Sequence, residues 1–151
     1  MFKDTSIEIY FSLSGTEPEW DFPLSIVTER LGINPTETIK LGEWVNINNP
    51  KIKRQHTFTE WVYSTGIVET YDFEKLMKEV VHVFKDKVDI INELIREFQI
   101  EPKLKAVVYV EEGLSPGYVL ELEVMQFALN IGAEIEIDDY ISGFVEDTDE
   151  E

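Results

Sequence analysis

One long segment constrains the fold of this chain more than any other feature. From Asp72 to Gln99, apolar side chains recur at steps of three or four residues, the spacing of one face of an α-helix. They are Phe73, Met77, Val80, Phe84, Ile91, Ile95 and Phe98, with Val88 in the one longer gap. Asp72 is a suitable N-cap, and Lys85–Lys87 is the expected place of a kink or of a division into two helices. Such an apolar stripe predicts a helix that covers another layer of the protein.

Four shorter segments have the composition of β-strands. They are Ser6–Leu13, Thr57–Ser64, Leu104–Val110 and Ala133–Tyr140. The third is dense in Val and apolar except for Lys105, which favours a central strand that is covered on both faces. The fourth alternates, so that Ile135 and Ile137 point to one face of the sheet while Glu134 and Glu136 point to the other.

Two shorter helices complete the predicted elements. Asp21 is placed to cap the first, and Gly32 is placed to end it. The second ends at Gly132, and Pro102 stops the long helical segment. We therefore expect an α+β fold: a two-layer sandwich with a mixed, mostly antiparallel sheet of about four or five strands and with one long and two shorter helices, largely on one face.

The size and composition of the chain indicate one domain. It has 151 residues, of which 43% are apolar. We expect residues 1–145 to form a single α+β domain and residues 146–151, five of which are acidic, to form a disordered tail. The absence of Cys excludes disulfides, thiolate zinc sites and cysteine nucleophiles. A cytoplasmic location is expected, without a secretion signal or a membrane span.

Part of the chain resembles a known family. The run from Asp21 to Thr36 contains a Leu-Gly-Ile-x-Pro-Thr turn and is followed by Gly42 and Trp44, and an Ile-Asp-x-Tyr motif ends the last predicted strand at Tyr140. These motifs resemble a family of small bacterial proteins catalogued as domain of unknown function 4279. The resemblance implies a compact α+β bacterial domain with no assigned activity, and it transfers no functional residues. The turn itself has a structural explanation, because Gly32 ends a helix that the later proline prevents from continuing.

Acidic residues far outnumber basic ones, with 31 Asp and Glu against 13 Lys and Arg and a net charge of −18. The excess is concentrated in residues 101–151, which contain 14 of the acidic and only two of the basic side chains. Such a chain repels phosphate backbones and favours basic partners. The one basic cluster comprises Lys51, Lys53, Arg54 and His56. It is too small for a nucleic-acid footprint and is better interpreted as a solvated loop, or as a group that pairs with acidic residues of the same or another molecule.

The last predicted strand carries the best candidate for a cation site. Glu134, Glu136 and Asp138 share one face, and Asp139 follows them. A solvated face, or an edge strand charged against pairing with other chains, is the favoured interpretation. No calcium-binding loop motif supports a metal, so neither a metal nor any other cofactor is predicted.

The sequence lacks the usual signatures of an enzyme. It has no paired metal-binding histidines and no phosphate-binding loop. His82 lies on the polar flank of the long helix, without a nucleophile signature to accompany it. Glu111 and Glu112 are adjacent, so their carboxylates point to opposite faces of a strand. We therefore predict a non-catalytic protein and rank an enzyme of unknown type third.

The three tryptophans are the remaining functional candidates. Trp20 and Trp44 fall in predicted loops and Trp61 in a predicted strand, where each side chain either fills the core or anchors an interface. The favoured hypothesis is an acidic protein-binding domain, such as an immunity protein or another inhibitor of a basic, nuclease-like bacterial toxin. The tryptophans would anchor the partner, and the face formed by Glu134, Glu136 and Asp138 would attract it.

The alternative hypothesis is a small-molecule binding domain. Its pocket would lie between the sheet and the helices, lined by the aromatic residues Tyr10, Trp61, Tyr63 and Tyr109. This hypothesis predicts an apolar cavity with a few polar groups, whereas an inhibitor predicts an acidic surface with exposed aromatic residues. The sequence leaves open the identity of the partner and the oligomeric state.

Overall fold

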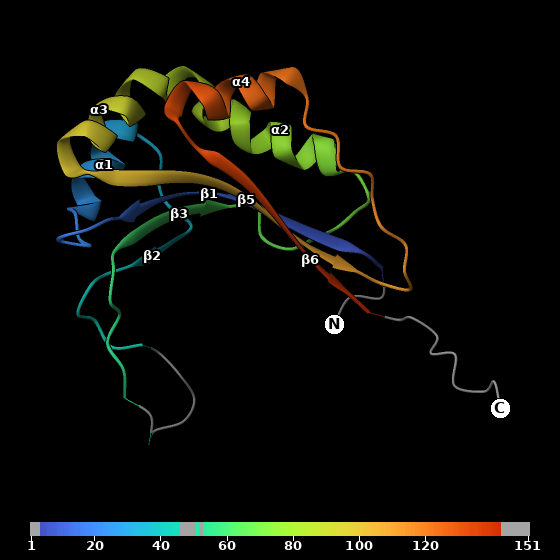
Figure 1. The fold of residues 1–151 in the computed structure, drawn as a ribbon, viewed down its shortest axis with the longest axis horizontal. Helices are drawn as coiled ribbons and strands as arrows, with labels where there is room; N and C mark the ends of the chain where they lie inside the picture. Colours follow the sequence, from blue (N-terminus) through green and yellow to red (C-terminus); the bar gives the residue numbers. More distant parts are fainter. Residues whose placement is uncertain (1–3, 46–50, 52, 143–151) are drawn as a thin grey trace.

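The computed structural model describes residues 4–45, 51 and 53–142, which form a curved β-sheet with a layer of helices on one face (Figure 1). The sheet contains β1 (Ser6–Gly15), β2 (Glu37–Ile39), β3 (Glu60–Ser64), β4 (Val68–Glu69), β5 (Ile100–Val110) and β6 (Glu134–Ile141). Its order is β2-β3-β1-β5-β6, and the short β4 pairs with the start of β1. The predicted α+β fold is thus confirmed, with β2 and β4 as short additional strands.

The sheet is mixed and mostly antiparallel, as predicted. β1 pairs antiparallel with β3 on one side and with β5 on the other. Only β5 and β6 run parallel among the strands that the structure describes. This pair requires a crossover, which α4 (Leu122–Ile131) provides on the helical face.

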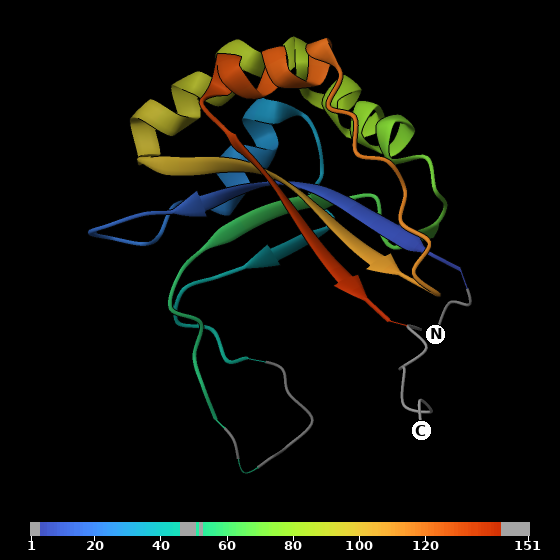
Figure 2. The same cartoon turned by 45° about the vertical axis from the view of Figure 1, so that its right-hand side comes forward.

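The predicted long helical segment consists of two helices. These are α2 (Phe73–Phe84) and α3 (Val88–Phe98), joined by the 3₁₀ turn η1 (Lys85–Lys87) at the predicted break. The side chain of Asp72 caps α2 as expected, because it accepts a hydrogen bond of 3.1 Å from the backbone N–H of Lys75. Together with α1 (Leu24–Leu31) and α4, these helices cover one face of the sheet (Figure 2).

Two predicted helix ends are confirmed, and one predicted cap is wrong. Gly32 and Gly132 end α1 and α4 in the left-handed conformation, at φ of 69° and 68°. Asp21 does not cap α1, because the residue directly before the helix is Pro23. The carboxylate of Asp21 instead accepts a hydrogen bond from the Thr59 hydroxyl and one of 2.8 Å from Nζ of Lys40.

These contacts make the contribution of Asp21 to stability depend on pH. The hydrogen bonds from Lys40 and Thr59 lower the pKa of Asp21 below its ordinary value of 3.8. Since the folded pKa is the lower one, the stabilisation is complete above pH 4 or so and disappears as the pH falls through the folded pKa. We expect Asp21→Asn to lower the free energy of unfolding by about 0.5–1 kcal/mol at neutral pH, because this ion pair is partly exposed. Urea unfolding of both proteins at neutral pH and over a series of acidic pH values measures the difference, and a loss that does not shrink as the pH falls further below 3.8 contradicts this explanation.

The core lies between the sheet and the helices. Alternate residues of β1, from Ile7 to Leu13, point toward the helices and are fully buried. Their neighbours include Trp61 of β3, which is also fully buried, and Phe84 of α2, whose ring centroid lies 4.5 Å from that of Phe11. Aromatic rings from the sheet and from α2 therefore meet in the centre of the core.

β5 differs from its prediction in two ways. It is central in the sheet as expected, but only its alternate residues, from Ile100 to Val110, are buried, because helices cover only one face. It also begins at Ile100 and contains Pro102, which was predicted to stop a helix. Pairing with β6 starts only at Lys103, so the missing N–H of Pro102 leaves no gap in that ladder.

No helix in residues 4–45, 51 and 53–142 is long and apolar enough to cross a membrane. The predicted acidic tail, residues 146–151, lies outside the described residues. The boundary of the domain predicted at residue 145 lies outside them as well.

Candidate functional site

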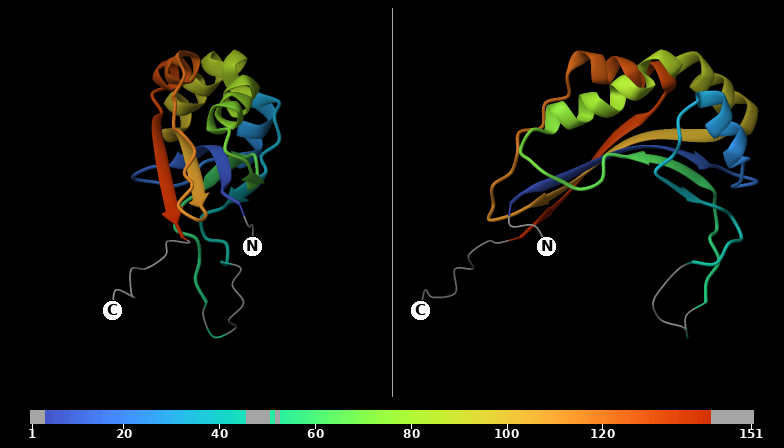
Figure 3. Two further views of the ribbon diagram at one scale, coloured as in Figure 1. Left: turned by 90° about the vertical axis from the view of Figure 1, so that its right-hand side faces the viewer. Right: turned by 180° about the vertical axis from the view of Figure 1, so that it is seen from behind.

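One face of the sheet lies away from the helices (Figure 3), and we call it the open face. On the three strands β1, β5 and β6, every second residue points to this side. These residues are Ser6, Glu8, Tyr10, Ser12, Ser14, Glu101, Lys103, Lys105, Val107, Tyr109, Glu134, Glu136, Asp138 and Tyr140. Charged groups thus occupy the middle of the open face.

The predicted acidic side chains of β6 do share the open face, and two of them form ion pairs there. Nζ of Lys103 lies 2.9 Å from Oε2 of Glu136, and Nζ of Lys105 lies 3.0 Å from Oδ2 of Asp138. The hydrogen bonds to these carboxylates raise the pKa of both lysines. Glu136 and Asp138 are therefore neutralised within the protein, whereas Glu134 is exposed.

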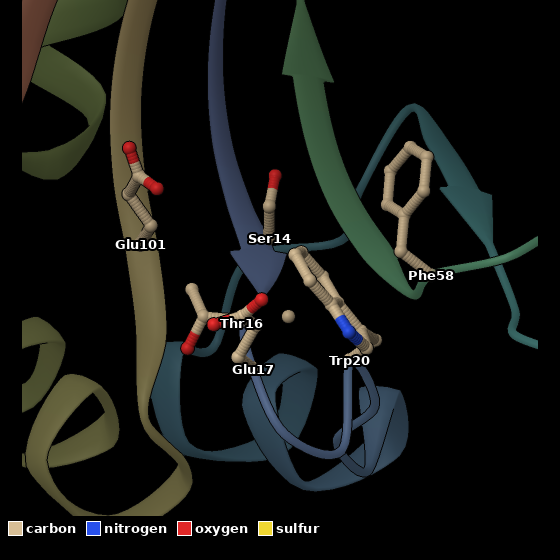
Figure 4. A pocket seen from close by; sticks show the side chains of 7 residues that line it. Ser14, Thr16, Glu17, Trp20, Phe58 and Glu101 are labelled. Atoms are coloured by element: carbon tan, nitrogen blue, oxygen red, sulfur yellow. The ribbon is translucent and has the colours of Figure 1, made fainter.

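A pocket opens at the end of the sheet where β1 stops, and we call it the Trp20 pocket. Its volume is about 600 Å³, and its walls are Ser14, Gly15, Thr16, Glu17, Trp20, Phe58 and Glu101. Figure 4 shows the Trp20 ring between Phe58 and the end of β1, with Glu101 on β5 at the opposite side. The pocket is thus built from three segments that are distant in sequence.

The loop that follows β1 positions Trp20. It folds back on itself, because the N–H of Trp20 donates a hydrogen bond of 2.8 Å to the carbonyl of Thr16. The carbonyl of Trp20 in turn accepts one of 2.8 Å from the N–H of Thr59. Trp20 has a φ of 58°, which is unusual for a residue other than glycine, and the Glu17-Pro18 peptide bond is cis. Hydrogen bonds at its N–H and at its carbonyl oxygen therefore hold Trp20 in a left-handed conformation that costs energy.

Gly15 is required for this arrangement. A Cβ atom on Gly15 would lie 2.5 Å from both the carbonyl carbon and the carbonyl oxygen of Trp20. The backbone of the loop thus packs directly against the end of β1, which leaves no room for a side chain. The close approach brings the Trp20 ring to the open face.

The chemistry of the Trp20 pocket favours a cationic ligand. Two carboxylates, Glu17 and Glu101, are exposed at its wall, and Ser14 donates a hydrogen bond of 2.9 Å to a third, Glu60. None of the described residues that line the pocket is basic. Trp20 is 42% exposed and offers an aromatic face, which attracts cations through its ring electrons.

The three tryptophans predicted to bind a partner lie in different environments. Trp20 lines the pocket, and Trp44 is 64% exposed in the connection between β2 and β3, opposite Gln55. Trp61 is completely buried, with ring centroids 6.4 and 6.0 Å from those of Phe11 and Phe84. The prediction of Trp61 as a partner-binding residue is therefore wrong, because its strand face lies beneath the helices.

The predicted lining of a pocket between the sheet and the helices is also wrong. Tyr10 and Tyr109 point to the open face, whereas Trp61 and Tyr63 point to the helices. The pairing of Tyr63 with Phe11 decides this, since directly opposed residues share a face and Phe11 belongs to the core. The four side chains cannot line one cavity.

The remaining candidates lie on the surface. His82 is an exposed residue of α2, 3.2 Å from the carboxylate of Glu123. Within the part of the chain that the structure describes, no three acidic or imidazole side chains are placed to hold a metal ion. The sequence alone does not indicate Glu17, Phe58 and Glu101 as candidates, because only the folded loop brings them together.

Comparisons with known proteins give one match. A family model described as "Domain of unknown function (DUF4279)" matches residues 5–142. No curated protein and no solved structure matches the chain.

Proposed function

Because this chain belongs to the DUF4279 family, whose description names no activity, we propose a function from its geometry: it is a non-catalytic domain that binds a basic protein. The Trp20 pocket carries this proposal. It combines an exposed indole with two exposed carboxylates and has no basic residue among its described walls. An arginine or lysine side chain of a partner matches all of these features.

The charge of the whole chain supports the same conclusion. The net charge is −18, and no Lys, Arg or His follows Lys105 in the sequence. A charge of this size accelerates encounter with a basic protein and discourages acidic partners. The biological form that we propose is an immunity protein, or another inhibitor of a basic, nuclease-like toxin, acting in the cytoplasm.

Arginine is the better occupant of the pocket. A guanidinium group is planar, so it stacks on an indole ring while its N–H groups donate to carboxylates at its edge. Trp20 supplies the ring, and Glu17 and Glu101 supply the acceptors. An ammonium group of lysine has the charge but not the planar shape, so we expect weaker binding.

Peptide binding tests the proposal. A Trp44→Phe background retains Trp20 and the buried Trp61, so that a change in indole fluorescence reports on the pocket. We expect an arginine-rich peptide to bind at low salt, and Trp20→Ala to weaken its binding, measured by calorimetry, by about tenfold or more. Salt should weaken binding to the unchanged pocket, because the attraction is partly electrostatic.

Two controls define the result. Trp44→Ala removes an exposed indole outside the pocket and should leave the affinity of the peptide unchanged. An acidic peptide of equal length should not bind. Equal affinity of the arginine-rich peptide for the Trp20→Ala variant and the parent contradicts a role of the pocket.

The pocket also supports a second candidate, a small-molecule binding domain. Its volume of about 600 Å³ lies within the range of small-ligand sites. The ligand would again be a cation, such as a free guanidinium or quaternary ammonium compound. If the free compound binds tightly and its affinity does not rise when it is part of a peptide, this candidate is favoured over a protein partner.

A further inference from the structure

The outer edge of β6 presents unused backbone hydrogen-bonding groups. Among the described residues, β6 pairs only with β5. The N–H of Ser142, just after β6, donates a hydrogen bond of 2.9 Å to the carbonyl of Val110. Because peptide groups alternate along a strand, the even-numbered residues of β6 bond to β5 and the odd-numbered ones point away from it. The outward residues are Ile135, Ile137, Asp139 and Ile141.

Exposed apolar side chains lie along the same edge. On β6, Ile137 is 36% exposed and Ile141 48% exposed. On α4, Leu122 and Leu129 are 80% and 74% exposed, although the opposite side of this helix is buried in the core. Figure 3 shows α4 and β6 together at one side of the molecule. A helix with two apolar faces, only one of which is covered, is typical of a protein interface.

The charge at this edge indicates what covers it. Glu134 and Asp139 are exposed on β6, and no basic residue occurs in the sequence from Ala106 onward. A second copy of the chain, paired through the same strand, would place acidic side chains beside acidic side chains. A basic segment instead complements them.

We propose that an extended segment of the basic partner pairs with β6 as an additional strand of the sheet. This inference rests on the proposed function and names a second contact of the same partner. On the open face, the side chains of the added strand would lie beside the exposed carboxylate of Glu134, so they should be basic. On the helical face they would lie beside Ile137 and Ile141, with Asp139 between these two, so they should be mainly apolar. The partner segment therefore alternates basic and apolar residues.

Amide hydrogen exchange tests the pairing directly. The probe is a peptide as long as β6 in which Lys and Val alternate, and its control has the same composition with all Lys before all Val. We expect the alternating peptide to slow exchange at the outward amides of β6 by about tenfold or more, while the control peptide does not. Tyr140, whose N–H already bonds to β5, should change less. If a saturating concentration of the alternating peptide leaves the exchange rates of the outward amides unchanged, the inference is overturned.

A matched pair of variants separates the backbone from the charge. Asp139→Pro removes one outward N–H without breaking a bond to β5, so the sheet should remain intact. Asp139→Asn removes the charge but retains the N–H. We expect Asp139→Pro to weaken binding of the alternating peptide by about tenfold and Asp139→Asn to weaken it less. Equal binding to both variants and to the parent contradicts strand addition, and thermal unfolding verifies that both are folded.

The Trp20→Ala variant distinguishes this inference from the proposed function. Protection of the outward amides in Trp20→Ala supports strand addition even if the pocket does not bind arginine. If the arginine-rich peptide binds at the pocket but the alternating peptide leaves the outward amides of β6 unprotected, strand addition alone is overturned. Failure of both peptides to bind overturns the two proposals together.

Discussion

Replacing Trp61 with alanine is expected to lower the free energy of unfolding by about 3–5 kcal/mol, the range for removal of a large buried aromatic side chain. Trp61 is completely buried, and its ring packs edge-on against Phe11 and Phe84. Its Nε1 also donates a hydrogen bond of 3.0 Å to Oγ1 of Thr28 on α1. The substitution therefore removes contacts that join β3 to β1, α1 and α2.

Urea unfolding of the purified variants measures this effect. Trp61→Phe retains a ring but loses the hydrogen bond to Thr28, so it should cost less than the alanine substitution. Trp44→Ala serves as the matched control, because Trp44 is exposed, and it should change stability by less than about 0.5 kcal/mol. Losses of similar size for Trp61→Ala and Trp44→Ala would contradict the central position of Trp61 in the core.

Gly15→Ala is expected to cost about 3 kcal/mol, the upper part of the range for an overpacked site, and to abolish peptide binding at the Trp20 pocket. The added Cβ would lie 2.5 Å from the backbone carbonyl of Trp20 and 2.8 Å from the nitrogen of Asp21. Both neighbours are main-chain atoms, so no side-chain rotation relieves the contact. The loop that carries Trp20 must move as a whole.

Gly117→Ala is the matched control for this prediction. A Cβ atom on Gly117 would meet no other heavy atom within 4 Å. Urea unfolding and binding of the arginine-rich peptide should therefore be nearly unchanged in this variant. If Gly15→Ala also retains both properties, the close packing of the loop against β1 does not shape the pocket.

The secondary structure could be predicted where local patterns are sufficient. The apolar stripe of α2 and α3, and the break at Lys85–Lys87, follow from helical spacing in one segment. The left-handed ends at Gly32 and Gly132 follow from the backbone freedom of glycine. The start of β5 could not be predicted in this way, because Pro102 is tolerated only where the pairing with β6 has not yet begun.

The candidate site could be predicted only in part. The sequence indicates Trp20 as a candidate, because a large aromatic residue in a loop is either a core residue or an anchor. Its partners Phe58 and Glu101 come from other segments, and only the fold of the loop over Gly15 brings them to one pocket. The exclusion of Trp61 likewise depends on which strand face the helices cover, which is a property of the assembled layers.

The pairing of β1 with β5 has a consequence for the synthesis of the protein. It joins the first strand of the described chain to a strand far along the sequence, from Ser6 opposite Tyr109 to Gly15 opposite Ile100. A ribosome releases β1 and β3 well before β5, so one edge of β1 has no strand to pair with until Ile100–Val110 has emerged. Productive folding is therefore expected to wait for most of the chain, and nascent chains that stall before Ile100 would expose the apolar face of β1 to aggregation.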